Sequence, residues 1–303
     1  MVGNFFPSVE GLTYYLDVSN LINLRYLVVH DNPLTSLDLT SNPNLEMLDV
    51  AHCGLTSIDV SNNQALDHFT GLENLLTSLD LSSNTALTSV AIEGNPLTYL
   101  NMKNGLTSEL IQFSTATNAG TLSCIETLDP EWATDNWTYE NGNVDQGTTF
   151  DVICNSEART KWYVSTSGSD LNGNGTSQSP LSSIQTALNA ATEGDTVYVA
   201  AGTYFENVVI QGKNILLSSH FFYSQDTSFI SSTIIDGGGN SACILIDGSF
   251  GLTPADVKIL GLTVKNGGVH SQEVGGGIVS KYNNNLEVEN CIILDNTGVT
   301  GGG

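Results

Sequence analysis

Four aspartates recur at an interval of 21 residues along the first third of the chain. They are Asp17, Asp38, Asp59 and Asp80, and the same position of the next copy holds Asn101. If the copies stack as neighbouring strands, the carboxylates lie in a row about 4.8 Å apart. Two such charges repel by only about 0.8 kcal/mol in water, so a solvated row is tolerated. The row could also hold a cation or a basic partner, and both interpretations stay open.

A second row of hydroxyl-bearing residues runs beside the aspartates, two positions earlier in each copy. It comprises Tyr15, Ser36, Ser57, Ser78 and Tyr99. Short polar side chains between aromatic ends suit a binding surface, since tyrosine combines an apolar ring with a hydrogen-bonding hydroxyl. We therefore expect a binding site made of Asp17, Asp38, Asp59, Asp80, Tyr15 and Tyr99.

Metal-binding patterns are weak elsewhere in the chain. The cysteines and histidines show no metal-ligand spacing, so we do not expect a zinc site. Asp170, Asn172 and Asn174 resemble the start of a calcium loop, but its twelfth position, which needs a bidentate Glu, is Leu181. A plain turn is favoured there. The sequence establishes no cofactor, and Ca²⁺ is kept as the one candidate ion.

The charge balance limits the partners. The 303 residues carry 32 Asp and Glu against 8 Lys and Arg, a formal net charge of −24, which disfavours nucleic acid and anionic membranes. No apolar run approaches the roughly 18 residues that span a bilayer, so no membrane insertion is expected. The opening MVGNFFPSVEG lacks a secretion signal, which predicts either a cytoplasmic protein or a missing N-terminus.

The aspartates belong to a repeat whose apolar positions keep the same register. Two ladders run Leu24, Leu45, Leu66, Leu87 and Leu27, Leu48, Phe69, Val90. The spacing L-x-x-L-x-L predicts a short strand with one buried face. The next polar position holds Asn32, Cys53, Asn74 and Asn95, whose buried side chains can donate to carbonyls of the turning backbone. One copy cannot bury its apolar edge alone, so stacked copies supply each other's core.

This pattern resembles the bacterial leucine-rich repeat with 21 residues per unit, over roughly residues 12–105. Gly71 departs from it, standing where Val29, Val50 and Ile92 do, and predicts a soft spot in the packing. The stretch after Gly105 resembles the C-terminal cap of such proteins, in which two cysteines flank a Trp-containing segment.

The resemblance to that cap implies a disulfide between Cys124 and Cys154. It would close a loop of about 30 residues, a constraint of roughly 3–4 kcal/mol in the loop-entropy model. A disulfide would also indicate an oxidising, extracellular setting. Trp132 and Trp137 are expected in the core of the cap, with a sugar platform as the less favoured interpretation.

The second half begins with the strand WYV, a Gly/Asn/Ser loop and an amphipathic helix with Ile184, Ala187, Leu188 and Ala191 at helical spacing. Only short strands follow. GSDLNGNGTSQSP, the helix and GDTVYVAAGTYFENVVIQGKNI resemble the opening of a right-handed parallel β-helix of the pectate-lyase-like kind, whose first coil the helix caps. Asn266 and Asn296 are candidates for a buried asparagine ladder. The chain ends at Gly301–Gly303 as a new coil begins, which predicts a fragment.

Polysaccharide lyases of that fold commonly use calcium to neutralise a uronate and a Lys or Arg as base. Asp236, Asp247 and Asp295 follow predicted strand ends, with Lys265 or Lys281 as a potential base. No spacing ties these residues together, so corner aspartates and solvated lysines are favoured and no catalytic residue is assigned. A glycoside-hydrolase carboxylate pair is no better supported.

The predicted fold class is mainly β, with two solenoids in tandem: a leucine-rich repeat arc and a right-handed parallel β-helix with an N-terminal capping helix. The predicted domains are residues 1–105, the repeat; 106–160, the cap and linker; and 161–303, the truncated β-helix. The preferred function is an extracellular or bacterial cell-surface binding or adhesion protein for a polysaccharide or surface protein. The alternative is a polysaccharide lyase or glycoside hydrolase with catalytic coils beyond residue 303, and a cytoplasmic repeat scaffold is third.

Overall fold

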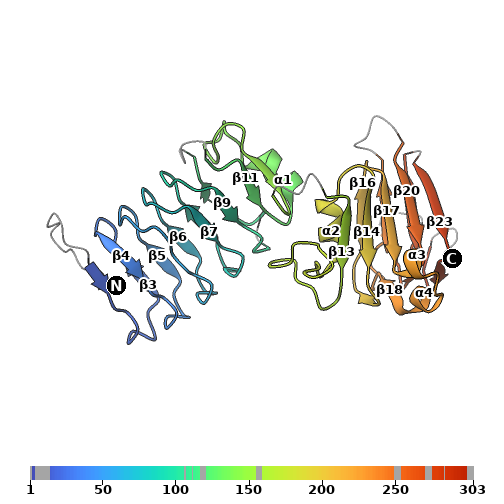
Figure 1. The fold of residues 1–303 in the computed structure, drawn as a ribbon, viewed down its shortest axis with the longest axis horizontal. Coiled ribbons are helices and arrows are strands. Elements are labelled where there is room, and N and C mark those ends of the chain that lie inside the picture. Colours follow the sequence, from blue (N-terminus) through green and yellow to red (C-terminus); the bar gives the residue numbers. More distant parts are fainter. Residues whose placement is uncertain are drawn as a thin grey trace. The chain divides into compact units, whose positions relative to one another are not determined.

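The computed structural model describes residues 2–3, 14–105, 107–110, 112–116, 121–154, 159–248, 254–269, 275–282 and 284–298. Gly301–Gly303, on which the predicted truncation rests, lie outside them. The chain divides into two compact units, Met1–Cys154 and Asn155–Gly303, whose strands are drawn in Figure 1. The strand pairings of the described residues are all parallel, which confirms a mainly β chain.

Within the first unit, the residues that the structure describes form sheets of six, four and two strands, in the orders β1-β3-β5-β6-β8-β10, β12-β11-β9-β7 and β2-β4. The six-stranded sheet comprises β1 (Val2–Gly3), β3 (Tyr26–Val28), β5 (Met47–Asp49), β6 (His68–Thr70), β8 (Ser89–Ala91) and β10 (Gln112–Ser114). The others comprise β7 (Ser78–Asp80), β9 (Tyr99–Asn101), β11 (Cys124–Glu126), β12 (Thr149–Asp151), β2 (Tyr14–Leu16) and β4 (Leu34–Leu37). Leu27, Leu48, Phe69 and Val90 pair in succession, as the 21-residue register predicts.

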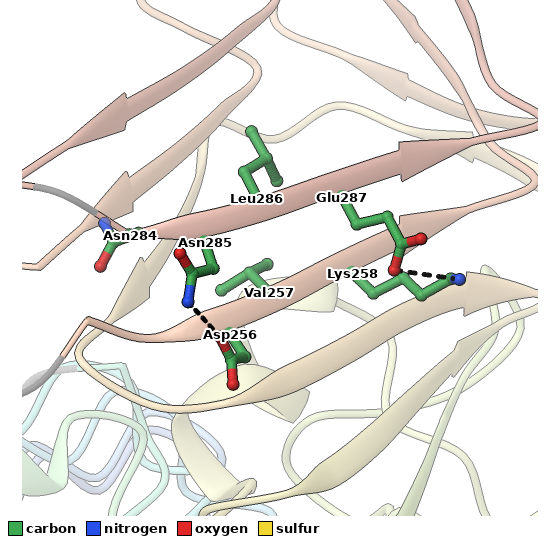
Figure 2. A pocket seen from close by; sticks show the side chains of 7 residues that line it. All are labelled: Asp256, Val257, Lys258, Asn284, Asn285, Leu286 and Glu287. Atoms are coloured by element: carbon green, nitrogen blue, oxygen red, sulfur yellow. Dashed lines mark hydrogen bonds and ion pairs between the residues drawn. The ribbon is translucent and has the colours of Figure 1, made fainter.

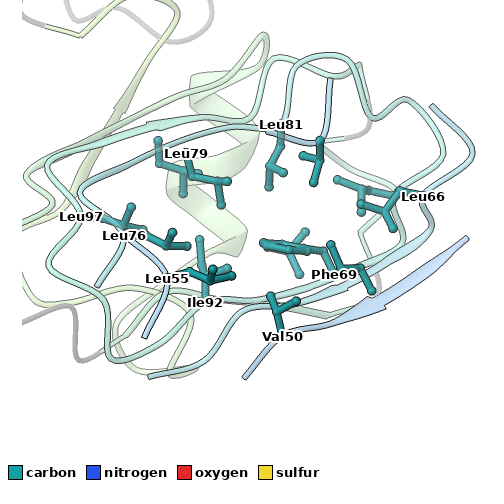
Figure 3. Close-up of a cluster of buried hydrophobic side chains, with 14 of the residues drawn as sticks. Val50, Leu55, Leu66, Phe69, Leu76, Leu79, Leu81, Ile92 and Leu97 are labelled. Carbon is teal, nitrogen blue, oxygen red and sulfur yellow. The ribbon is translucent and has the colours of Figure 1, made fainter. Parts of the chain in front are cut away.

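The core of the first unit lies between two walls of each repeat. In Figure 3, Leu79 and Leu81 point inward from one wall, and Val50 and Phe69 point inward from the other. The predicted soft spot at Gly71 is wrong. A Cβ there would stand 3.1 Å from Cζ of Phe69, so the larger ring at the leucine position fills the space that Gly71 leaves.

Buried amides tie neighbouring repeats together. At the predicted polar position, Asn74 Nδ2 donates to the carbonyl of Val50 at 2.9 Å, and the Cys53 thiol lies 3.2 Å from the carbonyl of Val29. A second ladder, Asn42, Asn63 and Asn84, was not predicted. Asn63 Nδ2 in that ladder donates to the carbonyls of Leu39 at 3.2 Å and Asn42 at 2.8 Å. Each repeat therefore satisfies the turning backbone of its predecessor.

The end of the first unit is closed by α1 (Pro130–Asn136), with Asp129 as its N-cap. Cys124 in β11 and Cys154 just after β12 form a disulfide with a Cα–Cα distance of 5.9 Å. Trp137 is 4% exposed, and its ring centroid lies 4.1 Å from that of Phe113. The tryptophan therefore packs in the core of this end segment and offers no open ring face as a sugar platform.

The described residues of the second unit form sheets of five, four and three strands, in the orders β13-β14-β17-β20-β23, β15-β18-β21-β24 and β16-β19-β22. The five-stranded sheet comprises β13 (Lys161–Val164), β14 (Asp195–Val199), β17 (Ile215–Ser219), β20 (Asp256–Leu260) and β23 (Asn285–Glu289). The four-stranded sheet comprises β15 (Gly202–Tyr204), β18 (Thr233–Asp236), β21 (Thr263–Lys265) and β24 (Ile292–Leu294). The last comprises β16 (Val208–Gln211), β19 (Ile244–Asp247) and β22 (Ile278–Lys281).

Three short helices accompany these sheets in the described part of the second unit. They are α2 (Ile184–Ala190), α3 (Phe221–Ser224) and α4 (Ser228–Ser232). Both ends of α2 meet a charged side chain from elsewhere in the unit. The Glu206 carboxylate accepts from the backbone N–H groups of Ile184 and Gln185, each at 2.9 Å. The Lys213 ammonium donates to the carbonyls of Leu188 at 2.6 Å and Ala191 at 2.7 Å. Both charges complement the helix dipole.

The expected pairing of Asn266 with Asn296 in one buried ladder is wrong. Lys265 pairs with Leu294, so Asn266 is one residue past this rung and Asn296 is two residues past it. Asn296 is buried and donates to the carbonyl of Val264 at 3.1 Å, whereas Asn266 has φ +55° and donates to the Asp236 carboxylate at 2.8 Å. The equal spacing of two asparagines in sequence therefore did not give them equivalent positions.

Candidate binding surfaces

The aspartate row lies on the wall of the repeats opposite β5 and β6. Leu79 and Leu81, which flank Asp80, point into the core from that wall in Figure 3. Asp17, Asp38, Asp59 and Asp80 are exposed. Asp80 pairs with Asn101, and β2 pairs with β4 through Leu16 and Leu37, the residues that precede Asp17 and Asp38. The structure therefore places these side chains on one face, as the repeat predicts.

Each aspartate also forms a hydrogen bond within its own turn. Its Oδ1 accepts from the backbone N–H two residues later, at 2.9 Å in Asp17, Asp59 and Asp80 and 3.0 Å in Asp38. Thr40 adds a hydroxyl hydrogen bond to Asp38 at 2.6 Å. Such bonds turn the chain out of the strand. Asn101 makes the same bond to the N–H of Lys103 at 3.0 Å, which shows that an amide can replace the carboxylate in this turn.

The electrostatics of the row follow from these bonds. Hydrogen bonds from the side chain and backbone of the residue two positions later lower the pKa of Asp17, Asp38 and Asp59. The neighbouring Asp38 carboxylate pushes the pKa of Asp17 and of Asp59 upward, but by less. Asp17, Asp38 and Asp59 therefore stay ionised at neutral pH and present negative charges toward solvent.

The flanking hydroxyl row is exposed as well. Tyr15 is 70% exposed and pairs with Ser36, and Tyr99 is 38% exposed and pairs with Ser78. Burial raises the pKa of Tyr99, and the nearby Glu126 and Asp80 carboxylates raise it further by smaller amounts. Its hydroxyl lies 3.2 Å from Oε2 of Glu126. Tyr99 therefore connects the aspartate row to the end segment, whereas Tyr15 stands open at the other end.

A buried ion pair, which the sequence analysis missed, ends this row. Lys103 is 3% exposed and Glu126 7%, and Lys103 Nζ lies 2.9 Å from Oε2 of Glu126. Glu126 pairs with Asn101 in the neighbouring strand, so it continues the acidic row with its charge neutralised. A signal was present: the fifth repeat reads Asn101-Met-Lys103 where its predecessors read Asp, an apolar residue, then Ser or Thr.

The candidate catalytic residues of the second unit do not converge on one site. Asp236 pairs with Lys265 in register, with Lys265 Nζ 3.6 Å from Oδ2 of Asp236. Asp247 pairs with Lys281 on a different sheet, and Asp295 follows β24. The Asp170 carboxylate accepts from the N–H groups of Ser182 at 2.8 Å and Ser183 at 3.1 Å. Asp170 therefore holds the loop against the residues before α2, as a plain turn would.

A pocket of about 480 Å³ lies over β20 and β23 in the second unit. Figure 2 shows its charged and polar side chains paired across the two strands: Asn285 Nδ2 donates to Asp256 at 2.7 Å, and Lys258 lies 3.2 Å from Glu287. Lys258 also pairs with Glu289 at 2.8 Å. These groups satisfy each other, so the pocket offers little polar chemistry to a ligand.

The described residues also bear on metal binding and on membrane spanning. No group of three or more His, Cys, Asp or Glu among them is arranged to hold a metal ion. None of their helices has the length and apolarity needed to cross a bilayer.

No protein-family model and no curated protein matches the chain. Among solved structures, the functional domain of InlJ from Listeria monocytogenes, which includes a cysteine ladder, aligns with 64% of this chain at 21% identity and a TM-score of 0.34. The alignment spans 45% of the length of that structure.

Proposed function

We propose that this chain is a binding protein of the bacterial surface or extracellular space, which recognises a glycan or protein ligand through the outer faces of its stacked strands. The observation that carries the proposal is the aspartate row. Four exposed carboxylates are held in the same orientation by the same turn, beside a row of hydroxyls with tyrosines at both ends. A repeated, rigid row of one charge favours a basic protein surface as the ligand.

The proposed architecture behind this surface is a leucine-rich repeat stack followed by a right-handed parallel β-helix. We propose domain limits of residues 1–105 for the repeats, 106–160 for the cap and linker, and 161–303 for the β-helix. The 21-residue register of the first unit and the three parallel sheets of the second support this division. The Cys124–Cys154 disulfide favours an oxidising compartment.

The test compares two variants of equal charge. Asp17→Asn, Asp38→Asn, Asp59→Asn and Asp80→Asn together neutralise the row, and the amide keeps the turn, as Asn101 shows. The control neutralises four other exposed carboxylates of the same unit, Asp31, Glu109, Glu131 and Asp135. Binding to an immobilised lysine-rich peptide is measured by interferometry for both variants and the unchanged chain.

The row variant should bind about tenfold more weakly than the control variant, because four clustered charges lose several weak ion pairs at once. Equal weakening of the two variants would mean that binding follows net charge alone. That result would contradict a specific role for the row.

A polysaccharide lyase or glycoside hydrolase is the second candidate. The observation in its favour is Asp236, a buried carboxylate between Lys265 Nζ at 3.6 Å and Asn266 Nδ2 at 2.8 Å. Incubation of the full chain with polygalacturonate and Ca²⁺ should then release an unsaturated uronate, detected by its ultraviolet absorbance, and Lys265→Met should abolish the signal. No release from the unchanged chain would exclude a lyase site at Asp236 and Lys265.

A further inference from the structure

A second concave site lies in the end segment of the first unit, apart from the aspartate row. This end pocket has a volume of about 460 Å³. It lies between the C-terminal end of α1 with the turn that follows and the segment that leads into β12. Its lining includes Trp137, Tyr139, Glu140, Asp145 and Phe150. The exposed Tyr139 and two acidic residues thus border one cavity, and no lysine or arginine lines it.

The hydrogen-bond donors of the pocket lining are largely used within the protein. The hydroxyls of Thr134, Thr148 and Thr149 donate to the carbonyls of Pro130, Leu122 and Ser123, at 2.8, 3.0 and 3.1 Å. The backbone N–H groups of Trp137, Thr138, Thr148 and Thr149 donate to Ala133, Asn143, Asp145 and Ser123. The lining therefore offers a ligand mainly acceptors: hydroxyl oxygens with remaining lone pairs and carboxylates.

The charged residues that line the pocket are all acidic. Glu140 is exposed and takes part in none of the ion pairs of the described residues. The C-terminal end of α1 adjoins the pocket, and its last turn carries no basic side chain, so the negative end of the helix dipole is not compensated there. Tyr139 is 56% exposed, which leaves its ring available to a ligand.

We propose that the end pocket binds an organic cation, an alkylammonium or guanidinium group such as a lysine or arginine side chain presents. The cation donates hydrogen bonds to the carboxylate of Glu140 and to the threonine oxygens, and it lies against the ring of Tyr139. An anionic ligand would meet the carboxylates, and a neutral apolar ligand would leave the acceptors unsatisfied. The site does not depend on the aspartate row, because the two share no residue.

The experiment titrates small probes into the ¹⁵N-labelled full chain and follows amide shifts. The probes are N-acetyl-lysine amide, N-acetyl-arginine amide, butylammonium and, as the neutral isostere, N-acetyl-norleucine amide. We expect saturable shifts at Tyr139 and Glu140 with a Kd on the order of 1 mM for the cations, and about tenfold weaker binding of the norleucine probe. Stronger binding by the two amino-acid amides than by butylammonium would identify the source as a protein side chain, and the reverse would identify a free amine.

Two variants test the roles of the ring and the charge. Tyr139→Leu and Glu140→Gln should each weaken cation binding about threefold to fivefold, and the double variant at least about tenfold. Glu131→Gln, an exposed carboxylate of α1 outside the lining, is the matched control and should change binding less than about twofold. All three positions are exposed, so the fold is retained.

Equal binding of the norleucine and lysine probes would overturn the proposal. So would shifts that persist in the double variant, or the absence of saturable shifts at any probe concentration. None of these results bears on the aspartate row, whose test uses different variants and an immobilised peptide.

Discussion

The two units stack parallel strands by different means. In the first, contacts between neighbouring repeats keep a separation of 21 residues, and buried asparagine amides bridge them. In the second, contacts near the starts of successive strands of one sheet join residues 21, 42 and 29 apart, from Glu193 to Asn214, Asp256 and Asn285. A constant repeat length lets one side chain do the same task in every copy. Where the length between strands varies, side chains no longer occupy equivalent positions in every copy, but segments such as α3 and α4 can be inserted between strands.

The ends of the units show the same contrast. The last repeat of the first unit carries the buried Lys103–Glu126 pair and a disulfide beside it. The second unit places α2 next to β16, where the Gln185 side chain exchanges hydrogen bonds with the backbone of Val209 at 2.7 and 3.1 Å, in the manner of a strand. We therefore expect the single substitutions with the largest effect on the free energy of unfolding to lie where the sequence of the first unit departs from its own repeat.

The largest effect is expected at Lys103. Lys103→Met should lower the free energy of unfolding by about 3–5 kcal/mol, because it leaves the Glu126 carboxylate buried without its partner. The double variant Lys103→Met, Glu126→Gln should recover most of the loss, since no uncompensated charge remains. Urea unfolding of both variants measures this coupling. Equal stability of the single and double variants would contradict a buried ion pair.

A smaller effect is expected within the asparagine ladder. Asn63→Ala removes the amide hydrogen bonds to the carbonyls of Leu39 and Asn42, which keep only their backbone N–H donors, and should cost about 2 kcal/mol. Asn62→Ala, at the exposed neighbouring position, is the control and should change the free energy of unfolding by less than about 0.5 kcal/mol. If the two variants unfold at the same urea concentration, the ladder does not stabilise the stack.

In the second unit the sensitive contact is at α2. Lys213→Met removes the ammonium from the carbonyls of Leu188 and Ala191, and should destabilise the end of α2 by about 1–2 kcal/mol. Amide hydrogen exchange should then be about tenfold faster in α2, with the first unit unchanged. Lys161→Met, an exposed lysine of the same unit, is the control. Unchanged exchange in α2 would show that the ammonium contributes nothing to it.

The smallest effect is expected at the one repeat that carries a cysteine in place of asparagine. Cys53→Asn offers an amide where the thiol lies 3.2 Å from the carbonyl of Val29 and 3.5 Å from that of Ala51. An amide is the stronger donor, so the free energy of unfolding should rise by about 0.5–1 kcal/mol. A loss of stability would mean that the pocket around Cys53 is shaped for sulfur and that the repeats are less equivalent than their spacing indicates.

The repeat was predictable because a periodic sequence shows the same physical constraint several times. The aspartate row, its exposed face and the amides of Asn74 and Asn95 all follow from positions counted 21 residues apart. The ladder of Asn42, Asn63 and Asn84 was equally regular and was missed, since polar residues in SNPN, SNNQ and SSNT are typical of an exposed loop. Their amides are buried because each reaches back to a carbonyl of the preceding repeat.

The second unit was predicted less well because its copies differ in length. Short strands were expected after the capping helix, as observed, but the helices α3 and α4 were not predicted. Without a fixed period, no position can be compared with an equivalent one. For this reason the expected pairing of Asn266 with Asn296 was wrong. The register between the two strands is given by the pairing of Lys265 with Leu294, and the sequence spacing of the asparagines does not reveal it.

The sequence by itself determined the parts that repeat: the parallel strands, the buried leucine ladders and the row of Asp17, Asp38, Asp59 and Asp80. A 21-residue period states which side chains are neighbours, so their burial and charge can be inferred without coordinates. Only the tertiary structure decided the parts where residues distant in sequence meet once. The Lys103–Glu126 pair, the filling of the space at Gly71 by Phe69 and the end pocket around Tyr139 and Glu140 each depend on a single packing arrangement, which no pattern in the chain repeats.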